Sequence, residues 1–346
     1  MKRILLLILT VALLAGFSSM PADVEAKDTV RIAYVPIMHF APLYVAAERG
    51  YFAEQGIDAQ FVRVKSGTEC MAFLTEGKVS VGAIAVVASA WNAFHKGMDL
   101  KIVAAAGLKR KKDDPTMLLV RKDLHDSGEV TKPSDLRGRR VAMAGGPGSG
   151  GEYLVAKALE GSGLTVFDVK MSKIGNPDMP MAFKTKAIDA ALTGSPYAQQ
   201  ILMAGTGEVL VKDMVPGAMT VVFVYSGKFI KERPEVAKKF MVGLMKGARA
   251  MQGKGFLDDR NMAAYLKYQK ATEAAIRKGM PMLYDPNLTI YTESLADIER
   301  VHMNNGRLTY SKPIDKRKVA DPSFQEYAVS VLGKAEMVPP VTDATQ

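Results

Sequence analysis

The chain has 346 residues, of which 48% are hydrophobic and 24% are charged, and its formal net charge at pH 7 is +10. This composition excludes a disordered chain and predicts a globular protein of about two domains. The single cysteine, Cys70, excludes an internal disulfide, and the four histidines stand in no spacing typical of a metal site. We therefore expect no metal, no cofactor and no catalytic residue.

The positive charge favours anions as partners, but it does not identify one. No zinc knuckle, helix-turn-helix pattern or aromatic-interleaved basic segment accompanies it, so nucleic acid is not an expected partner. The strongest basic run, residues 109–112, is followed directly by Asp113 and Asp114. This order favours a solvated loop over an anion-binding patch.

The N-terminal segment is typical of a secretory signal peptide. Lys2 and Arg3 precede an apolar run over residues 4–17, and Ala26 ends a stretch of small and polar residues. The apolar run is shorter than the roughly 20 residues that a membrane-spanning helix needs. Phe17 stands where a lipoprotein would need its cysteine, so we expect a periplasmic, unlipidated protein after removal of residues 1–26.

From Lys27 onward, short apolar runs alternate with stretches of helical period. The first series predicts strands at 29–35, 57–64, 79–86 and 100–107, and helices at 42–54, 68–76 and 88–96. This alternation is typical of an α/β fold in which helices flank a mainly parallel sheet.

A second series repeats the first at an offset of 110 residues. The matching blocks are 31–34 with 141–144, 45–46 with 155–156, 58 with 168, and 71–73 with 181–183; after one deletion, 79–84 matches 187–192. Four blocks in register favour two lobes of one design, although chance similarity between two α/β units is the alternative.

Two extended segments, 116–122 and 220–225, stand where connections between such lobes would fall. If both cross, the first lobe comprises residues 27–122 and 222–346, and the second comprises 123–221. A hinge of two strands would then allow the lobes to close on a ligand.

Ligands of open parallel sheets bind beyond the carboxyl ends of the strands, near the N-termini of the helices that follow. The loop over residues 145–151 has the sequence GGPGSGG and stands at such a point. Glycine permits close backbone approach, so we expect Gly146, Gly148, Ser149 and Gly150 to contact a ligand. A tight structural turn and a nucleotide site are the alternatives, but neither GxxxxGK[ST] nor a clean GxGxxG occurs.

The equivalent loop of the first series is apolar and aromatic, so Met38, His39 and Phe40 are expected to hold the organic part of a ligand. His39 would either donate to an oxyanion or pack in the wall.

Two further loops carry hydroxyl groups at the start of a helix. They contribute Ser66 and Thr68, and Thr193 and Ser195, as candidate contacts. Ser66 and Thr68 could equally serve as helix caps.

Several segments together resemble one family. APLYVA at 41–46, GYF at 50–52, PSDLRGRRV at 133–141 and IDAA at 188–191 resemble the sulfonate/taurine/nitrate and thiamine-pyrimidine branch of periplasmic binding proteins. The resemblance covers essentially the whole chain after the signal peptide. It implies the type II periplasmic binding protein fold, and an ABC transporter permease in the inner membrane as partner.

The resemblance also implies a small-molecule ligand between the lobes: sulfonate-, carboxylate- or nitrate-like, or alternatively a thiamine-pyrimidine-like heterocycle. We expect a monomer. Enzymes occur on similar folds, but His39 and Cys70 stand in no pattern for nucleophilic chemistry, and the export signal speaks against an intracellular enzyme.

Overall fold

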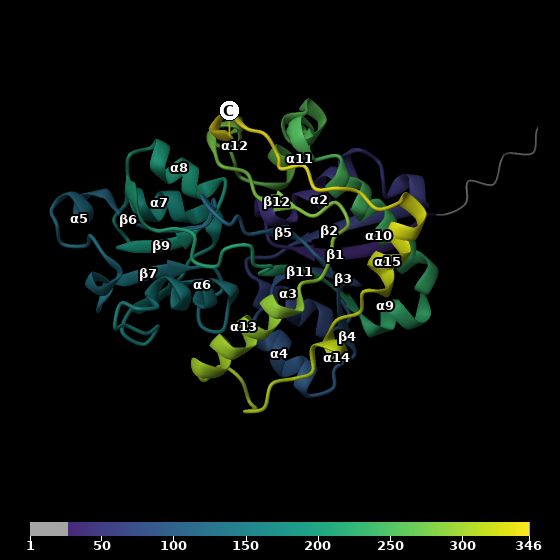
Figure 1. Ribbon diagram of the computed structural model, residues 1–346, viewed down its shortest axis with the longest axis horizontal. Coiled ribbons are helices and arrows are strands. Elements are labelled where there is room, and N and C mark those ends of the chain that lie inside the picture. Colours follow the sequence, from purple (N-terminus) through teal and green to yellow (C-terminus); the bar gives the residue numbers. More distant parts are fainter. Residues whose placement is uncertain (1–26, 346) are drawn as a thin grey trace, which may run out of the picture.

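The computed structural model describes residues 27–345, in which two five-stranded sheets lie side by side (Figure 1). The first sheet has the order β2 (Ile57–Arg63), β1 (Asp28–Tyr34), β3 (Val81–Ala85), β11 (Val221–Ser226) and β4 (Leu100–Ala105). The second has the order β10 (Gly207–Val211), β6 (Met117–Arg121), β9 (Ala190–Thr193), β7 (Arg140–Met143) and β8 (Lys170–Lys173). A two-stranded sheet joins β12 (Leu283–Tyr284) to β5 (Gly107–Leu108).

Both large sheets share one topology. β1 pairs in parallel with β2 and β3, and β7 pairs in parallel with β8 and β9. One interior strand of each sheet runs antiparallel to its neighbours. In the first sheet this is β11, which is antiparallel to β3 and β4, and in the second it is β6, which is antiparallel to β9 and β10. The expected α/β fold is confirmed, and an inserted antiparallel strand in each sheet is what the sequence did not reveal.

The helices follow the strands in both halves. With the first sheet come α2 (Ala41–Glu48), α3 (Gly67–Thr75) and α4 (Ala88–His95), and with the second come α5 (Lys122–Asp126), α6 (Gly150–Leu159), α7 (Met179–Lys184) and α8 (Tyr197–Met203). The later helices are α9 (Gly227–Glu232), α10 (Pro234–Arg249), α11 (Asp259–Tyr268), α12 (Glu273–Lys278), α13 (Thr292–Asn304), α14 (Lys316–Val319) and α15 (Ser323–Leu332). None of the helices in residues 27–345 is long and apolar enough to span a membrane.

The helix predicted over 42–54 ends early, at Glu48. Gly50 has φ +79°, a left-handed conformation that a helix cannot continue through and that glycine adopts at little cost. The chain then forms a short 3-10 turn over Ala53–Gln55 before entering β2.

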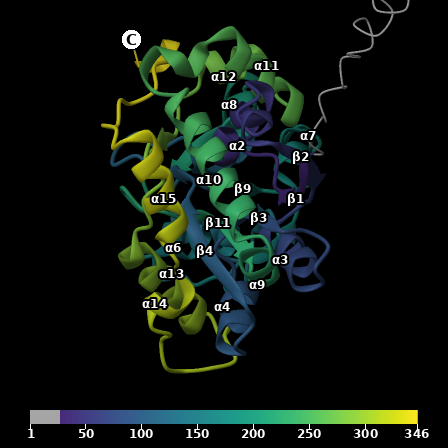
Figure 2. The same ribbon diagram turned by 90° about the vertical axis from the view of Figure 1, so that its right-hand side faces the viewer.

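Burial explains why the strands are so apolar. Every residue of β11 is buried, because the strand has a neighbour on both sides and helices over the sheet. Helix α10 packs against α2 and α15 over this sheet (Figure 2). A second, smaller core lies under the other sheet, where Phe183 and Ile201 pack against Leu119 and Ala142.

The predicted repeat lies on equivalent elements. Its blocks fall in β1 and β7, in α2 and α6, in α3 and α7, and in β3 and β9. The Asp58 and Asp168 match is less regular, since Asp58 is in β2 whereas Asp168 precedes β8.

The predicted lobe boundary at residues 122 and 123 separates β6 from the sheet to which it belongs. Residues 117–121 form an inner strand between β9 and β10, and the chain passes between the sheets over 109–116 and 212–220 instead. The apolar run of β6 is typical both of a buried inner strand and of an extended connection, and the sequence alone does not distinguish the two. We propose that the second lobe begins before residue 117; the division into two lobes itself stays a prediction. The predicted signal peptide and its cleavage at Ala26 lie outside the described residues.

Candidate functional site

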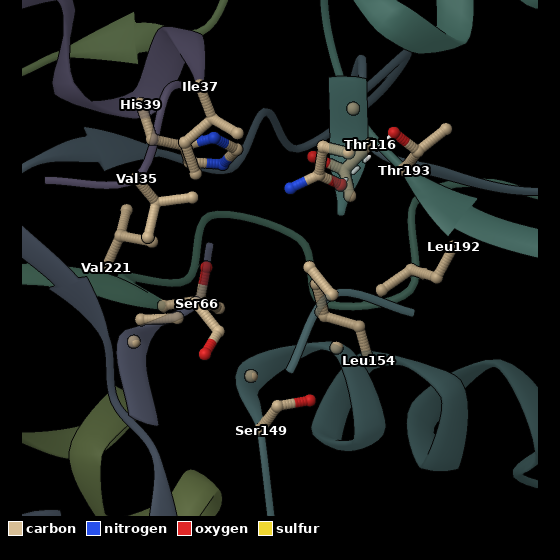
Figure 3. Close-up of a pocket in the computed structure, with 18 of the residues that line it drawn as sticks. Val35, Ile37, His39, Ser66, Thr116, Ser149, Leu154, Leu192, Thr193 and Val221 are labelled. Atoms are coloured by element: carbon tan, nitrogen blue, oxygen red, sulfur yellow. Dashed lines mark hydrogen bonds between the residues drawn. The ribbon is translucent and has the colours of Figure 1, made fainter. Parts of the chain in front are cut away.

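A pocket lies between the two large sheets, and loops from both sheets form its walls (Figure 3). It contains about 740 Å³ of space free of protein atoms, including the part open to solvent. Val35, Ile37, His39, Ser66 and Val221 border one side, and Thr116, Leu154, Leu192, Thr193 and Ser149 border the other. The pocket therefore lies at the carboxyl ends of β1, β7 and β9, where an open α/β sheet is expected to bind its ligand.

Among the described residues that line the pocket, Lys109 is the one that is charged, and its side chain is only 2% exposed. Its ammonium donates to Thr116 Oγ1 at 2.5 Å and lies 3.4 Å from Asp114 Oδ1 and 3.4 Å from His39 Nε2. The expectation of a solvated loop over 109–112 is wrong for this residue. The Asp114 carboxylate accepts from the backbone N–H groups of Arg110 and Thr116, and this turns the loop back so that Lys109 points inward.

His39 is a neutral residue of the wall. Burial and the positive charge of Lys109 hold its pKa well below the ordinary value. A neutral ring facing an ammonium accepts at Nε2, so the proton resides on Nδ1. Burial also lowers the pKa of Lys109, an effect that Asp114 opposes. The charge of Lys109 is thus compensated within the protein.

Two serines predicted to contact the ligand also cap the helices that point toward the pocket. Ser66 Oγ accepts from the Glu69 N–H at the start of α3, and Ser149 Oγ accepts from the Glu152 N–H at the start of α6. Each hydroxyl keeps its own proton for donation. The positive ends of two helix dipoles therefore face the pocket together with two hydroxyl groups.

Only part of the glycine loop lines the pocket. Gly150 lines the pocket with Ser149, but Gly146 and Gly148 lie outside the lining. Gly148 has φ +74°, and a Cβ atom there would lie 3.2 Å from Ala88 Cβ. The backbone carbonyl of Gly148 accepts a hydrogen bond from the Ala88 N–H. Gly148 therefore lets the loop dock on the other half of the molecule.

The remaining predicted residues divide in the same way. Phe40, Thr193 and Ser195 line the pocket. Met38 is buried behind it, where its sulfur accepts from Gln269 Nε2, and Thr68 is exposed on α3. The glycine loop and the residues after β9 were predictable from their place after strands.

Sequence reasoning missed Lys109, Thr116 and Asn176, which also line the pocket. Lys109 and Thr116 belong to the connection between the sheets, and Asn176 follows β8. For Lys109 the signal in the sequence was Asp114, five positions later, whose carboxylate pairs with the Lys109 ammonium.

Polar contacts tie the two halves together beside the pocket. Glu152 of α6 is fully buried, accepts from the Gly148 N–H at 2.5 Å and forms an ion pair with Arg307 Nη2 at 2.6 Å. Tyr153 donates to Asp297 Oδ2 of α13 at 2.8 Å. These contacts fix the N-terminal end of α6 against the half of the molecule that contains the first sheet.

In residues 27–345, no group of three or more His, Cys, Asp or Glu side chains is placed to hold a metal ion. Cys70 is buried against Ala33 and is not in the lining, and burial raises the pKa of its thiol. It is therefore not poised to act as a nucleophile.

The two sheets and the pocket between them define the type II periplasmic binding protein fold. The chain belongs to the NMT1-like family, whose profile matches residues 23–267. The predicted resemblance to this group of binding proteins is confirmed.

Two curated relatives are similar over part of the chain. The riboflavin-binding protein RibY of Chloroflexus aurantiacus is 26% identical over 63% of this chain and 60% of its own length. The formylaminopyrimidine-binding protein of Halalkalibacterium halodurans is 28% identical over 50% of each. The chain thus spans between half and 60% of the length of these relatives.

Solved structures agree in fold at lower identity. The nitrate-binding protein NrtA of Synechocystis PCC 6803 has a TM-score of 0.75 at 15% identity, with 89% of each chain covered. A ligand-binding component of an ABC-type import system from Staphylococcus aureus has a TM-score of 0.71 at 16% identity, with 87% of this chain and 99% of that chain covered. The desulfurization enzyme DSZB has a TM-score of 0.64 at 15% identity, with 88% of this chain and 100% of the DSZB chain covered. Binding proteins and at least one enzyme therefore share this fold.

Proposed function

We propose that the protein is the extracytoplasmic solute-binding component of an ABC importer. It captures a small organic ligand between its two halves and delivers it to the permease of that importer. The observation that carries the proposal is the pocket itself, because both sheets contribute its walls and its lining contains apolar surface and a few convergent polar groups. A periplasmic location and a monomeric state belong to the same proposal.

The lining favours an uncharged organic body in this pocket over a bare oxyanion such as nitrate. Ile37, Phe40, Leu154 and Leu192 supply apolar surface, and the charge of Lys109 is paired with Asp114. The hydroxyl groups of the lining would recognise oxygen or nitrogen atoms of a planar heterocycle or a similar molecule.

Mass spectrometry of the protein purified without denaturation tests the proposal. A small molecule should be retained, be released on unfolding and rebind with one site per chain in calorimetry. Ser195→Ala should weaken binding by about tenfold or less, since one neutral hydrogen bond contributes roughly 0.5–1.5 kcal/mol. Thr68→Ala is the matched control, because Thr68 is exposed outside the pocket. Equal loss in both variants would argue against this pocket.

An enzyme on this fold is the second candidate, because DSZB shares it. The pocket argues against it, because Ser66 and Ser149 cap helices and His39 faces a lysine. Cys70 lies outside the lining. An unaltered ligand after prolonged incubation supports binding, whereas a chemically changed product recovered from it would favour catalysis.

A further inference from the structure

A second pocket adjoins the first and is lined from both halves of the molecule. Both pockets include Val35, and three short segments supply neighbouring residues to each: 35–37, 63–67 and 175–178. The second pocket contains about 680 Å³ free of protein atoms, again counting the part open to solvent. A ligand longer than the first pocket would extend into it.

The two pockets differ in charge. The second is lined by the cationic side chains Arg63, Lys65 and Lys270 and by one carboxylate, Asp178. Among residues 27–345, none of these three cations forms an ion pair within 4.0 Å. The second pocket therefore carries an excess of positive charge, whereas the one charge of the first is paired inside the protein.

The cations of the second pocket come from two separate segments of the chain. Arg63 and Lys65 lie at the end of β2 and in the loop after it, and Lys270 follows α11, so they come from separate parts of the half built on the first sheet. Gly175, Pro177 and the carboxylate residue Asp178 come from the other half. An anion held here would contact both halves, and the guanidinium of Arg63 offers the paired donors that carboxylate, sulfonate and phosphate groups accept.

We propose that the second pocket is an anion subsite. It holds the acidic group of a ligand whose uncharged body lies in the first pocket, so the substrate class is an apolar or heterocyclic body that carries a carboxylate, sulfonate or phosphate. This inference rests on the proposed function and adds to it the position of the ligand's charge.

A matched pair of fluorescent probes tests the subsite. N-Phenyl-1-naphthylamine is uncharged, and 8-anilinonaphthalene-1-sulfonate has the same rings with a sulfonate. Measured on the full-length protein freed of retained ligand, the sulfonate probe should bind more tightly, and its advantage should fall with added salt because the cations are exposed. Arg63→Gln and Lys270→Gln should each weaken the sulfonate probe by about fivefold and leave the neutral probe unchanged.

The control variant is Lys228→Gln, which removes an exposed lysine of α9 outside both pockets and should change neither probe. Equal affinity for both probes, with no effect of the Arg63 and Lys270 substitutions, would overturn the subsite and leave the first pocket standing. Failure of both probes to bind would overturn the subsite together with the pocket assignment. Unfolding midpoints of all variants show whether a change in binding reflects a change in folding.

Discussion

At the scale of single residues, the pairing of Lys109 with Asp114 decides which charge the pocket presents. Both side chains are almost fully buried, at 2% and 4% exposure. Removal of one partner leaves the other as an uncompensated buried charge, which costs about 3–5 kcal/mol.

We therefore expect Lys109→Met to lower the free energy of unfolding by about 3 kcal/mol. Adding Asp114→Asn should recover part of this loss, since the asparagine carries no charge and its one side-chain oxygen still accepts from one of the two backbone N–H groups. Urea denaturation followed by circular dichroism measures both. If the double variant is less stable than the single one, the pair does not have the role assigned to it.

Two buried histidines make stability depend on pH. Burial holds the pKa of His39 and of His302 below the ordinary value near 6.5. Below that value the unfolded chain takes up protons that the folded protein does not, so stability falls as pH falls, by up to about 1.4 kcal/mol per pH unit for each group.

The free energy of unfolding should accordingly decline from pH 7 to pH 5.5. His302→Gln should reduce the slope of that decline, and His125→Gln, which removes an exposed histidine, serves as the control. A slope that His302→Gln leaves unaltered would contradict the assignment.

The sequence predicted the residues whose role follows from position after a strand. Ser66, Ser149, Thr193 and Ser195 stand at strand-to-helix junctions, and all four line the pocket. Lys109 could not be recognised in this way, because a run of basic residues is most often solvated and only the fold places Asp114 against it.

At the scale of elements, the N-terminus of α6 approaches β3 so closely that only glycine fits. A Cβ atom on Gly150 would lie 2.5 Å from Ala85 Cβ, although the backbone angle of Gly150 is one that alanine adopts. The obstacle to a side chain is therefore the opposing strand and not the local conformation.

We expect Gly150→Ala to hold the two halves apart and to weaken binding of the retained ligand by about tenfold, in line with the cost of overpacking. Ala85→Gly removes the opposing methyl group, so the double variant should bind more tightly than Gly150→Ala alone. Calorimetry on both single variants and the double variant decides it. Additive losses would show that the two residues do not meet in the ligand-bound protein.

Apolar periodicity predicted most strands and helices, because burial imposes it. It could not show which sheet a strand joins: β6 and β11 are both short apolar segments, and their pairing depends on residues about 70 to 140 positions away. The premature end of α2 followed from one glycine conformation that periodicity does not report.

At the scale of the whole molecule, the position of β6 sets the extent of the second lobe. A fragment over residues 109–220 contains every strand of the second sheet, whereas 123–221 lacks the inner strand β6. Without β6, β10 loses its partner and Leu119 leaves the core.

The longer fragment should therefore unfold cooperatively, and the shorter one should not. Thermal melts followed by circular dichroism, with amide exchange as a second measure, compare the two. Cooperative unfolding of residues 123–221 would restore the boundary that the sequence predicted.

The location of β11 inside the first sheet also determines when all the strands of that sheet are available along the chain. Within residues 27–345, β4 pairs with that sheet only through β11, whereas the second sheet draws all its strands from residues 117–211. During synthesis from the N-terminus, all strands of the second sheet are available before the last strand of the first sheet, β11, has been made. β3 can pair with β1 earlier, whereas β4 gains its neighbour in the sheet when residues 221–226 arrive between β3 and β4. The second sheet can thus be completed before the first, although the first sheet contains the strands nearest the N-terminus.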